Sequence, residues 1–271
     1  MTYELDEDTA LDPVADGTYA GRLTDRWDIA GGMNGGYLAA FCLRGVLAES
    51  TLPDPLTMTV YYLTRPEPGE AVVHVTTLRT GRGHASLGFE LEQGGERRCA
   101  GLAMCGRWRD RGPHDFQPAP PPLRRPEECL LVRPKGFPAG ALFERLEKRV
   151  MSHDDYFALR TEPGEARTGG WTRCVDGRPV DAYAAALFLD SWPPAVFSRT
   201  LRPDPGGAPT LEYTVHWRNR PTTEWHYTDL ETRTFAGGYV DEHGVLFDEA
   251  GVLVADSRQL ARYTVRPPAE G

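Results

Sequence analysis

The chain has 271 residues, of which 40% are hydrophobic and 25% charged, a balance typical of soluble globular proteins. Its formal net charge of −9 disfavours non-specific binding to nucleic acid. No apolar run approaches the roughly 18 residues that a membrane helix requires, and the acidic N-terminus lacks the pattern of a signal peptide, so we expect a cytoplasmic protein without nucleic-acid or membrane partners.

Five cysteines are scattered along the chain and form no CxxC pair. An odd number of cysteines without a pattern predicts reduced thiols. The lack of cysteine pairs also argues against a structural zinc site, so we expect no bound metal.

The first half of the sequence predicts one buried helix followed by four strands. A strand is expected over 19–29, and Asn34 suits the N-cap position of a helix that continues to residue 49. This helix is apolar on nearly every side, which is typical of a buried helix. The strands are expected over 56–63, 71–79, 85–93 and 98–108. Short turns rich in Gly, Pro and Glu separate them, so we predict an antiparallel meander.

The second half repeats this order after a segment, residues 110–128, that contains six prolines. A strand over 170–175 precedes an apolar helix over 180–192, which two prolines end. The next strand, 211–221, matches 56–66 at five of eleven positions. Further strands are expected over 225–235, 238–247 and 252–263. The sequence therefore predicts an internal duplication.

This duplication predicts an α+β fold in which a long helix lies across a curved antiparallel sheet, twice. The expected units are residues 1–109 and 129–271, joined by the proline-rich linker 110–128. The free edges of the two sheets can pair side by side, which would remove an aggregation hazard.

The pattern resembles the acyl-CoA thioesterase II family and its thioesterase-like relatives, which have a double hotdog fold. The blocks that carry this resemblance are residues 35–39, 63–66, 78–82, 171–173, 209–211, 217–221 and 251–259. The resemblance implies two tandem hotdog units, an acyl-CoA substrate and a role in lipid metabolism. It also implies hydrolysis by water without metal or cofactor, and assembly into a homo-oligomer.

In that family an Asp on the second helix, a Thr and a Gln hold the attacking water. Thr210 and Gln259 fall on the Thr and Gln positions, whereas Ala186 occupies the aligned position of the Asp. Asp190 follows one helical turn later on roughly the same face, and burial there would raise its pKa. We expect Asp190 to be the base. The alternative is that Asp190 meets solvent at the helix end and that the other two are structural strand residues.

The glycine-rich turn before the first helix is the candidate oxyanion site, formed by Asn34, Gly35, Gly36 and Tyr37. Free N–H groups and the helix dipole favour negative charge at a helix N-terminus, and glycine lets a substrate carbonyl approach the backbone. The structural alternative is a glycine-rich turn with an Asn cap.

Arginines are the candidate contacts for the phosphates of coenzyme A, because guanidinium groups suit phosphate oxygens. Arg82, in a Gly-Arg-Gly turn, is the first choice and Arg79 the second. Any one of them can equally be a solvated arginine at a sheet edge.

Two other functions stay open. A hotdog dehydratase or hydratase would need a His with a carboxylate, but Asn34 stands before the Gly-Gly turn where that His is expected. A non-catalytic protein that binds acyl-CoA or fatty acyl groups is the second alternative, because Ala186 replaces the family aspartate.

Overall fold

The computed structural model describes residues 2–29, 31–110, 112–132, 140–200 and 207–263. The remaining residues of the predicted units and linker lie outside this description. The elements of the first half are α1 (Glu4–Asp8), β1 (Leu11–Ala15), β2 (Thr18–Leu23), η1 (Asp25–Trp27), β3 (Asp28–Ile29), β4 (Gly32–Met33), α2 (Gly35–Glu49), β5 (Asp54–Tyr62), β6 (Gly69–Thr80), β7 (Ala85–Gln93) and β8 (Glu96–Gly106).

The second half contains η2 (Pro126–Glu128), β9 (Leu130–Leu131), α3 (Leu142–Arg145), β10 (Leu146–Val150), η3 (His153–Asp155), η4 (Phe157–Leu159), β11 (Arg167–Cys174), α4 (Ala182–Leu189), α5 (Phe197–Thr200), β12 (Thr210–Trp217), β13 (His226–Glu231), β14 (Phe235–Ala236), β15 (Tyr239–Asp248) and β16 (Leu253–Arg262). Except for β3 and β4, which pair in a separate two-stranded sheet, the described strands of both halves join into one 14-stranded sheet. Within the described chain, residues 107–125 contain no helix or strand.

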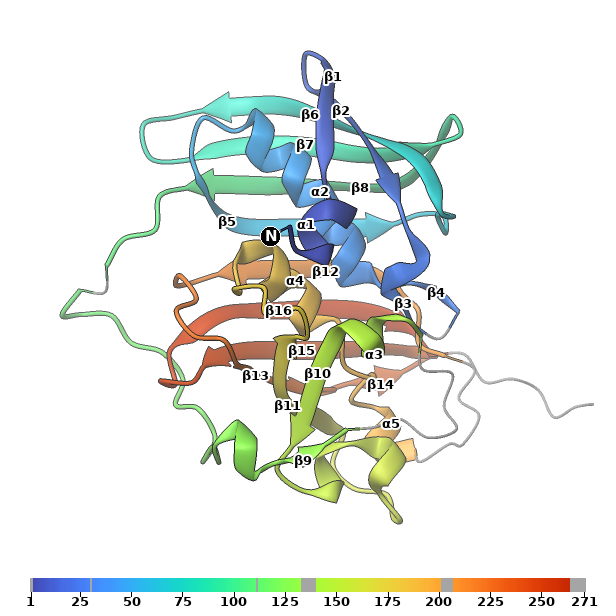
Figure 1. Cartoon of the computed structure of the whole chain (residues 1–271), viewed down its shortest axis with the longest axis vertical. Coiled ribbons are helices and arrows are strands. Elements are labelled where there is room, and N and C mark those ends of the chain that lie inside the picture. The colour runs from blue at the N-terminus through green and yellow to red at the C-terminus, as the bar shows by residue number, and fades with distance from the viewer. Residues whose placement is uncertain (1, 30, 111, 133–139, 201–206, 264–271) are drawn as a thin grey trace, which may run out of the picture.

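The strand order reads the same way outward from the centre of the sheet. On one side the order is β5, β8, β7, β6, β2, and on the other it is β12, β16, β15, β13, β11. The two series meet where β5 pairs antiparallel with β12. The predicted duplication and the predicted edge-to-edge pairing of the sheets are therefore confirmed, and Figure 1 shows the two halves one above the other.

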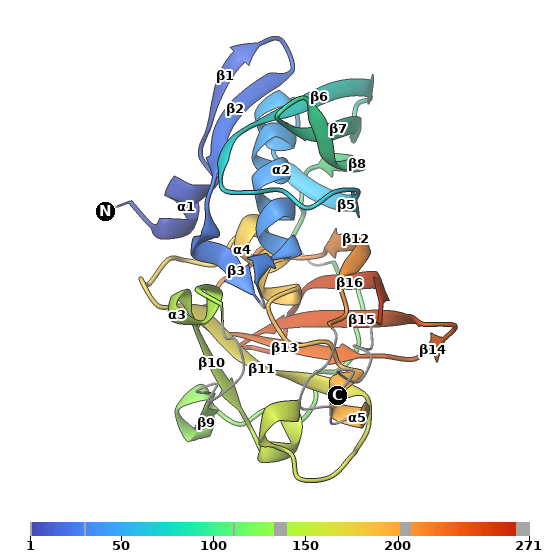
Figure 2. The same ribbon diagram turned by 90° about the vertical axis from the view of Figure 1, so that its right-hand side faces the viewer.

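Both long helices lie on the same face of the sheet, where Figure 2 shows α2 and α4 on one side of the strands. In α2 the side chain of Asn34 accepts a hydrogen bond from the Tyr37 N–H, as an N-cap does. In α4 the side chain of Asp181 accepts from the N–H groups of Tyr183 and Ala184. The buried residues of α2 occupy nearly every side of the helix, as its sequence predicts.

The two helices run antiparallel and touch through their backbones. A Cβ added at Gly36 would lie 2.7 Å from the Ala186 carbonyl oxygen and 2.9 Å from the Leu187 Cα atom. Only a glycine allows this separation, which brings the first turn of α2 against the last turn of α4.

Several predicted elements have other bounds in the structure: the strands expected over 211–221 and 225–235, for example, end at Trp217 and Glu231. The helix expected over 180–192 is shorter, because the cap at Asp181 starts it and Asp190 ends it as the C-cap. The strand expected over 19–29 ends at Leu23, where the Thr24 side chain accepts from the Arg26 N–H and starts a 3₁₀ turn. By contrast, β7 has the predicted bounds.

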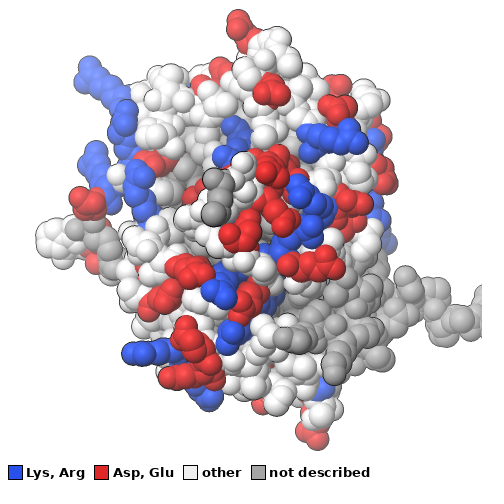
Figure 3. All heavy atoms as spheres, in the orientation of Figure 1, with Lys and Arg blue, Asp and Glu red and all other residues white. Residues whose placement is uncertain are grey.

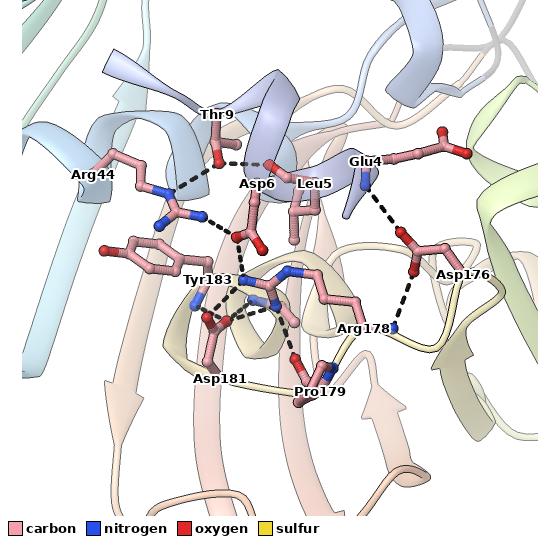
Figure 4. Close-up of polar contacts among 11 residues, drawn as sticks. Glu4, Leu5, Asp6, Thr9, Arg44, Asp176, Arg178, Pro179, Asp181 and Tyr183 are labelled. Atoms are coloured by element: carbon pink, nitrogen blue, oxygen red, sulfur yellow. Dashed lines mark hydrogen bonds and ion pairs between the residues drawn. The ribbon is translucent and has the colours of Figure 1, made fainter. Parts of the chain in front are cut away.

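An ion-pair cluster that the sequence did not predict ties α1 to both long helices (Figure 4). Arg178, with 3% of its side chain exposed, donates to Asp6 on α1 and to Asp181 at the start of α4. Arg44 of α2 also donates to Asp6, and its guanidinium lies 3.8 Å from the ring centre of Tyr183. The cluster therefore joins three segments that are distant in sequence.

On the face shown in Figure 3, acidic and basic side chains are interspersed over this region. Around α1, for example, Arg26 lies within ion-pair distance of Glu4, Glu7 and Asp8. No helix among the described residues is long and apolar enough to cross a membrane.

We predict that Arg178→Met lowers the free energy of unfolding by about 2–3 kcal/mol, because it leaves Asp6 and Asp181 without their buried partner. A fully buried pair would cost about 3–5 kcal/mol, and here both carboxylates are partly exposed. Urea unfolding measures the loss. As the control, Arg22→Met breaks an exposed ion pair with Glu70 and should cost less than about 1 kcal/mol. Equal losses in the two variants would contradict the role of the cluster.

Candidate active site

Asp190 lies where the end of α4 meets the beginning of α2. The side-chain amide of Asn34 donates to the Asp190 backbone carbonyl at 2.7 Å and to its Oδ2 at 2.9 Å. The Gly36 N–H donates to the same Oδ2 at 2.8 Å. A carboxylate thus occupies the positive end of a 15-residue helix.

The surroundings of Asp190 set its pKa near neutrality. Burial raises the pKa of Asp190 to about 6, while hydrogen bonds from Gly36, Gln259, Gly35 and Asn34 act to lower it. These donors favour the ionised form and so oppose the effect of burial. The carboxylate is therefore mostly ionised at pH 7 and still basic enough to accept a proton.

Gln259 connects Asp190 to Thr210. The Gln259 side chain is 4% exposed and is hydrogen-bonded to Asp190. Its Oε1 accepts from the Thr210 hydroxyl at 2.9 Å, which leaves the amide N–H₂ as the donor to Asp190. A register shift between Thr210 and Glu212, at the start of β12, places Thr210 opposite Ala261. The three residues expected to position the water are thus brought together.

The structure therefore places Asp190, and not position 186, in contact with Gln259. Ala186 is buried in the helix contact, where its carbonyl accepts from the Tyr213 hydroxyl at 2.8 Å. Asp190 is only partly exposed and is bound by several donors, which argues against its alternative interpretation as a solvated helix end.

The glycine turn holds Asp190 in this structure. The Gly36 N–H donates to Asp190, and the Tyr37 N–H donates to Asn34 Oδ1 at 3.0 Å. The Tyr37 ring is fully buried and its hydroxyl donates to the Asp8 carbonyl, so this side chain is part of the core. An oxyanion role for this turn stays a prediction.

The structure does not bring Arg79 and Arg82 to this centre. Their turn lies beside Gly106, which pairs with Asp54 at the start of β5, just beyond the C-terminal end of α2. Asp190 contacts the other end of that helix, about 22 Å away for 15 residues. Both arginines are exposed, and their assignment to coenzyme A stays a prediction.

Two tyrosines in the site escaped sequence analysis. The Tyr62 hydroxyl donates to the Gly35 carbonyl at 2.7 Å, and the Tyr213 hydroxyl donates to Ala186. Burial, with the Asp190 charge as the next cause, raises the pKa of both hydroxyls, so both stay protonated donors. Tyr62 lies on β5 and Tyr213 on β12. Their contacts with the helices depend on how these strands pack against α2 and α4, which the sequence does not show.

Comparison with known proteins identifies the family. Residues 23–106 match the model of the acyl-CoA thioesterase N-terminal domain, and residues 113–263 match that of the acyl-CoA thioesterase C-terminal domain. The chain belongs to the acyl-CoA thioesterase family. Family membership supports a thioesterase-type function, with an acyl-CoA as the implied substrate.

Similar solved structures confirm the double hotdog fold of this family member. A candidate thioesterase II from Thermobifida fusca is 27% identical, with a TM-score of 0.87 over 97% of this chain and 98% of that chain. A hot dog fold protein of unknown function from Alicyclobacillus acidocaldarius is 24% identical, with a TM-score of 0.87 over 98% and 100%. An uncharacterized protein of Mycobacterium tuberculosis is 24% identical over 277 residues, 90% of each chain.

We predict that Asp190→Asn stabilises the protein at pH 7.5 by up to about 3 kcal/mol. The folded-state pKa of about 6 lies above the ordinary 3.8, so the wild type loses stability as the pH rises from about 4 to 6. Asparagine does not ionise and avoids this loss.

Urea unfolding at pH 4 and pH 7.5 measures the gain, which should be much smaller at pH 4. Asp256→Asn serves as the control, because Asp256 lies on the same strand as Gln259 but forms an ion pair with Arg218. A gain in Asp190→Asn that does not depend on pH would refute the raised pKa.

Proposed function

We propose that this family member hydrolyses an acyl-CoA to a free acid and coenzyme A, using a water molecule that Asp190 activates. The observation that carries the proposal is the continuous contact of Thr210, Gln259 and Asp190 at the N-terminus of α2. This set combines a base of suitable pKa, two polar side chains that can orient a water, and a helix end that favours negative charge.

In the first step, the Asp190 carboxylate takes a proton from water while the water oxygen forms a bond to the thioester carbonyl carbon. The carbonyl π electrons move to its oxygen and form the oxyanion. In the second step the C=O double bond re-forms, the C–S bond breaks, and the sulfur of coenzyme A takes the proton from Asp190. The products are the carboxylic acid and the free thiol, and the carboxylate is regenerated.

The positive end of α2 serves both negative charges in turn. In the resting site the Gly36 N–H donates to the Asp190 carboxylate at 2.8 Å. Once Asp190 has accepted a proton, the hydrogen bond from the Gly36 N–H to its carboxyl group weakens. The N–H can then donate to an oxyanion beside it. The Asn34 amide, which donates to the same oxygen, supports the same transfer of charge.

The setting of the reaction is also part of the proposal. All five cysteines are free and buried, which fits a reducing compartment such as the cytoplasm. A role in lipid metabolism and self-association into an oligomer follow from the family resemblance and are proposed on that basis.

We predict that the purified protein releases free thiol from acyl-CoA substrates and that Asp190→Asn lowers kcat at least about 10³-fold, because the general base is lost. Thr210→Val and Gln259→Leu should lower kcat about 10- to 100-fold, since they misplace the water. A thiol-reactive dye follows the reaction with acyl chains of graded length. In the wild type, kcat/KM should fall below about pH 6, where Asp190 becomes protonated.

Asp256→Asn is again the matched control and should retain wild-type kcat. Normal thiol release by Asp190→Asn would remove Asp190 as the base. Lack of release from every acyl-CoA, with binding of a non-hydrolysable thioether analogue intact, would instead overturn the enzyme assignment in favour of a binding protein.

A further inference from the structure

We infer that Lys148 and Glu242 are positioning residues that hold the segment after Asp190 and thereby fix the Asp190 carboxylate. This inference deepens the proposed function and rests on it. It assigns a role to two buried ionisable side chains that the proposed hydrolysis does not use.

The segment from Ser191 to Ala195 connects Asp190 to α5. Its central residues are Pro193 and Pro194, which have no N–H to donate. Within the segment, the Trp192 indole N–H donates to the Thr172 hydroxyl at 3.1 Å, while the two prolines offer no backbone donor, so contacts at its two ends add to its anchoring. The backbone groups bound there by side chains from other strands are the Ser191 carbonyl and the Ala195 N–H.

Lys148 holds the first end. It lies on β10, is 1% exposed, and its side-chain nitrogen donates to the Ser191 carbonyl. The nitrogen also lies 4.8 Å from the ring centre of Phe143 and 4.9 Å from that of Trp192. Burial lowers the pKa of Lys148, and the nearby Asp190 charge opposes this shift.

Glu242 holds the second end. It lies on β15, is 7% exposed, and its Oε2 accepts from the Ala195 N–H at 2.5 Å. In the sheet Glu242 is directly opposite Gln259, so its carboxyl group lies beside the water-orienting residue. Burial raises the pKa of Glu242 to about 8, with the Asp190 charge as a further cause, so Glu242 is mainly protonated at pH 7.

Neither residue is explained by pairing with an opposite charge. Within the described ranges, no ion pair is formed by Lys148 or by Glu242. Burying an ionisable group without a counter-ion is costly, yet here both groups contact one five-residue segment. The ionisable groups that interact with Asp190 come from four strands: Tyr62, Lys148, Tyr213 and Glu242.

The test separates the reach of the Glu242 side chain from its charge. Glu242→Gln keeps the length and an oxygen that can accept from Ala195. Glu242→Asp keeps the carboxyl group but is one methylene shorter and cannot reach. Lys148→Met keeps an unbranched apolar side chain, one atom shorter, and removes the donor to Ser191. As a matched control, Asp248→Leu removes another buried β15 carboxylate that accepts backbone N–H groups.

The readout is the titration of Asp190 itself, followed by ¹³C carboxyl NMR of the whole protein and assigned by the signal missing in Asp190→Asn. The wild-type midpoint should be about 6. In Lys148→Met and Glu242→Asp it should rise by at least about half a pH unit, because Asp190 moves away from the Gly36 and Asn34 donors while staying buried. Glu242→Gln and Asp248→Leu should leave it unchanged.

In parallel, kcat for thiol release should fall about 10- to 100-fold in Lys148→Met and Glu242→Asp, with KM within about twofold of wild type. Glu242→Gln should keep the wild-type kcat. A normal Asp190 midpoint in both Lys148→Met and Glu242→Asp would overturn the inference. So would a shifted midpoint and lowered kcat in Glu242→Gln together with wild-type values in Glu242→Asp. The NMR midpoint needs no turnover, so failure of the inference is distinguishable from failure of the proposed function.

Discussion

The site depends on one close contact, in which the backbone of α2 at Gly36 touches the last turn of α4. A side chain at this position would overlap with the Ala186 carbonyl and push the helices apart. The contact places the end of α4 against the start of α2, so that the Asp190 carboxylate accepts a hydrogen bond from the Gly36 N–H in the first turn of α2. The Asp190 carboxylate and its donors are therefore held by main-chain geometry as well as by their own side chains.

Much of this architecture is encoded locally. The all-round apolar character of α2, its Asn cap and the short turns of the meander are properties of neighbouring residues, and they predict the elements well. Helix α2 starts directly after its predicted N-cap, Asn34. By contrast, α4 is overestimated at its C-terminal end, because Asp190 leaves the helix to contact residues some 150 positions earlier, which no local pattern can reveal.

The residues that the structure gathers around Asp190 were predictable only in part for the same reason. Asp190, Thr210 and Gln259 emerged from the family resemblance together with a one-turn shift along a helix face. Lys148 and Glu242 lie in ordinary strand sequence and acquire their surroundings from distant strands and from a loop. Likewise α1 and its partners in the Arg178 cluster carry no periodic pattern, so their contacts are visible only in three dimensions.

The near-palindromic sheet gives the chain two pseudo-equivalent places where a helix start meets a helix end. At the start of α2 the cap is a neutral asparagine, so the positive helix end remains available to Asp190. At the start of α4 the cap is Asp181, already neutralised by Arg178, and the neighbouring helix contributes Arg44. The first junction therefore holds a carboxylate at a helix start, and the second is closed by an ion pair. Two identical subunits would present the same junction at both places, whereas a tandem chain can hold two different ones.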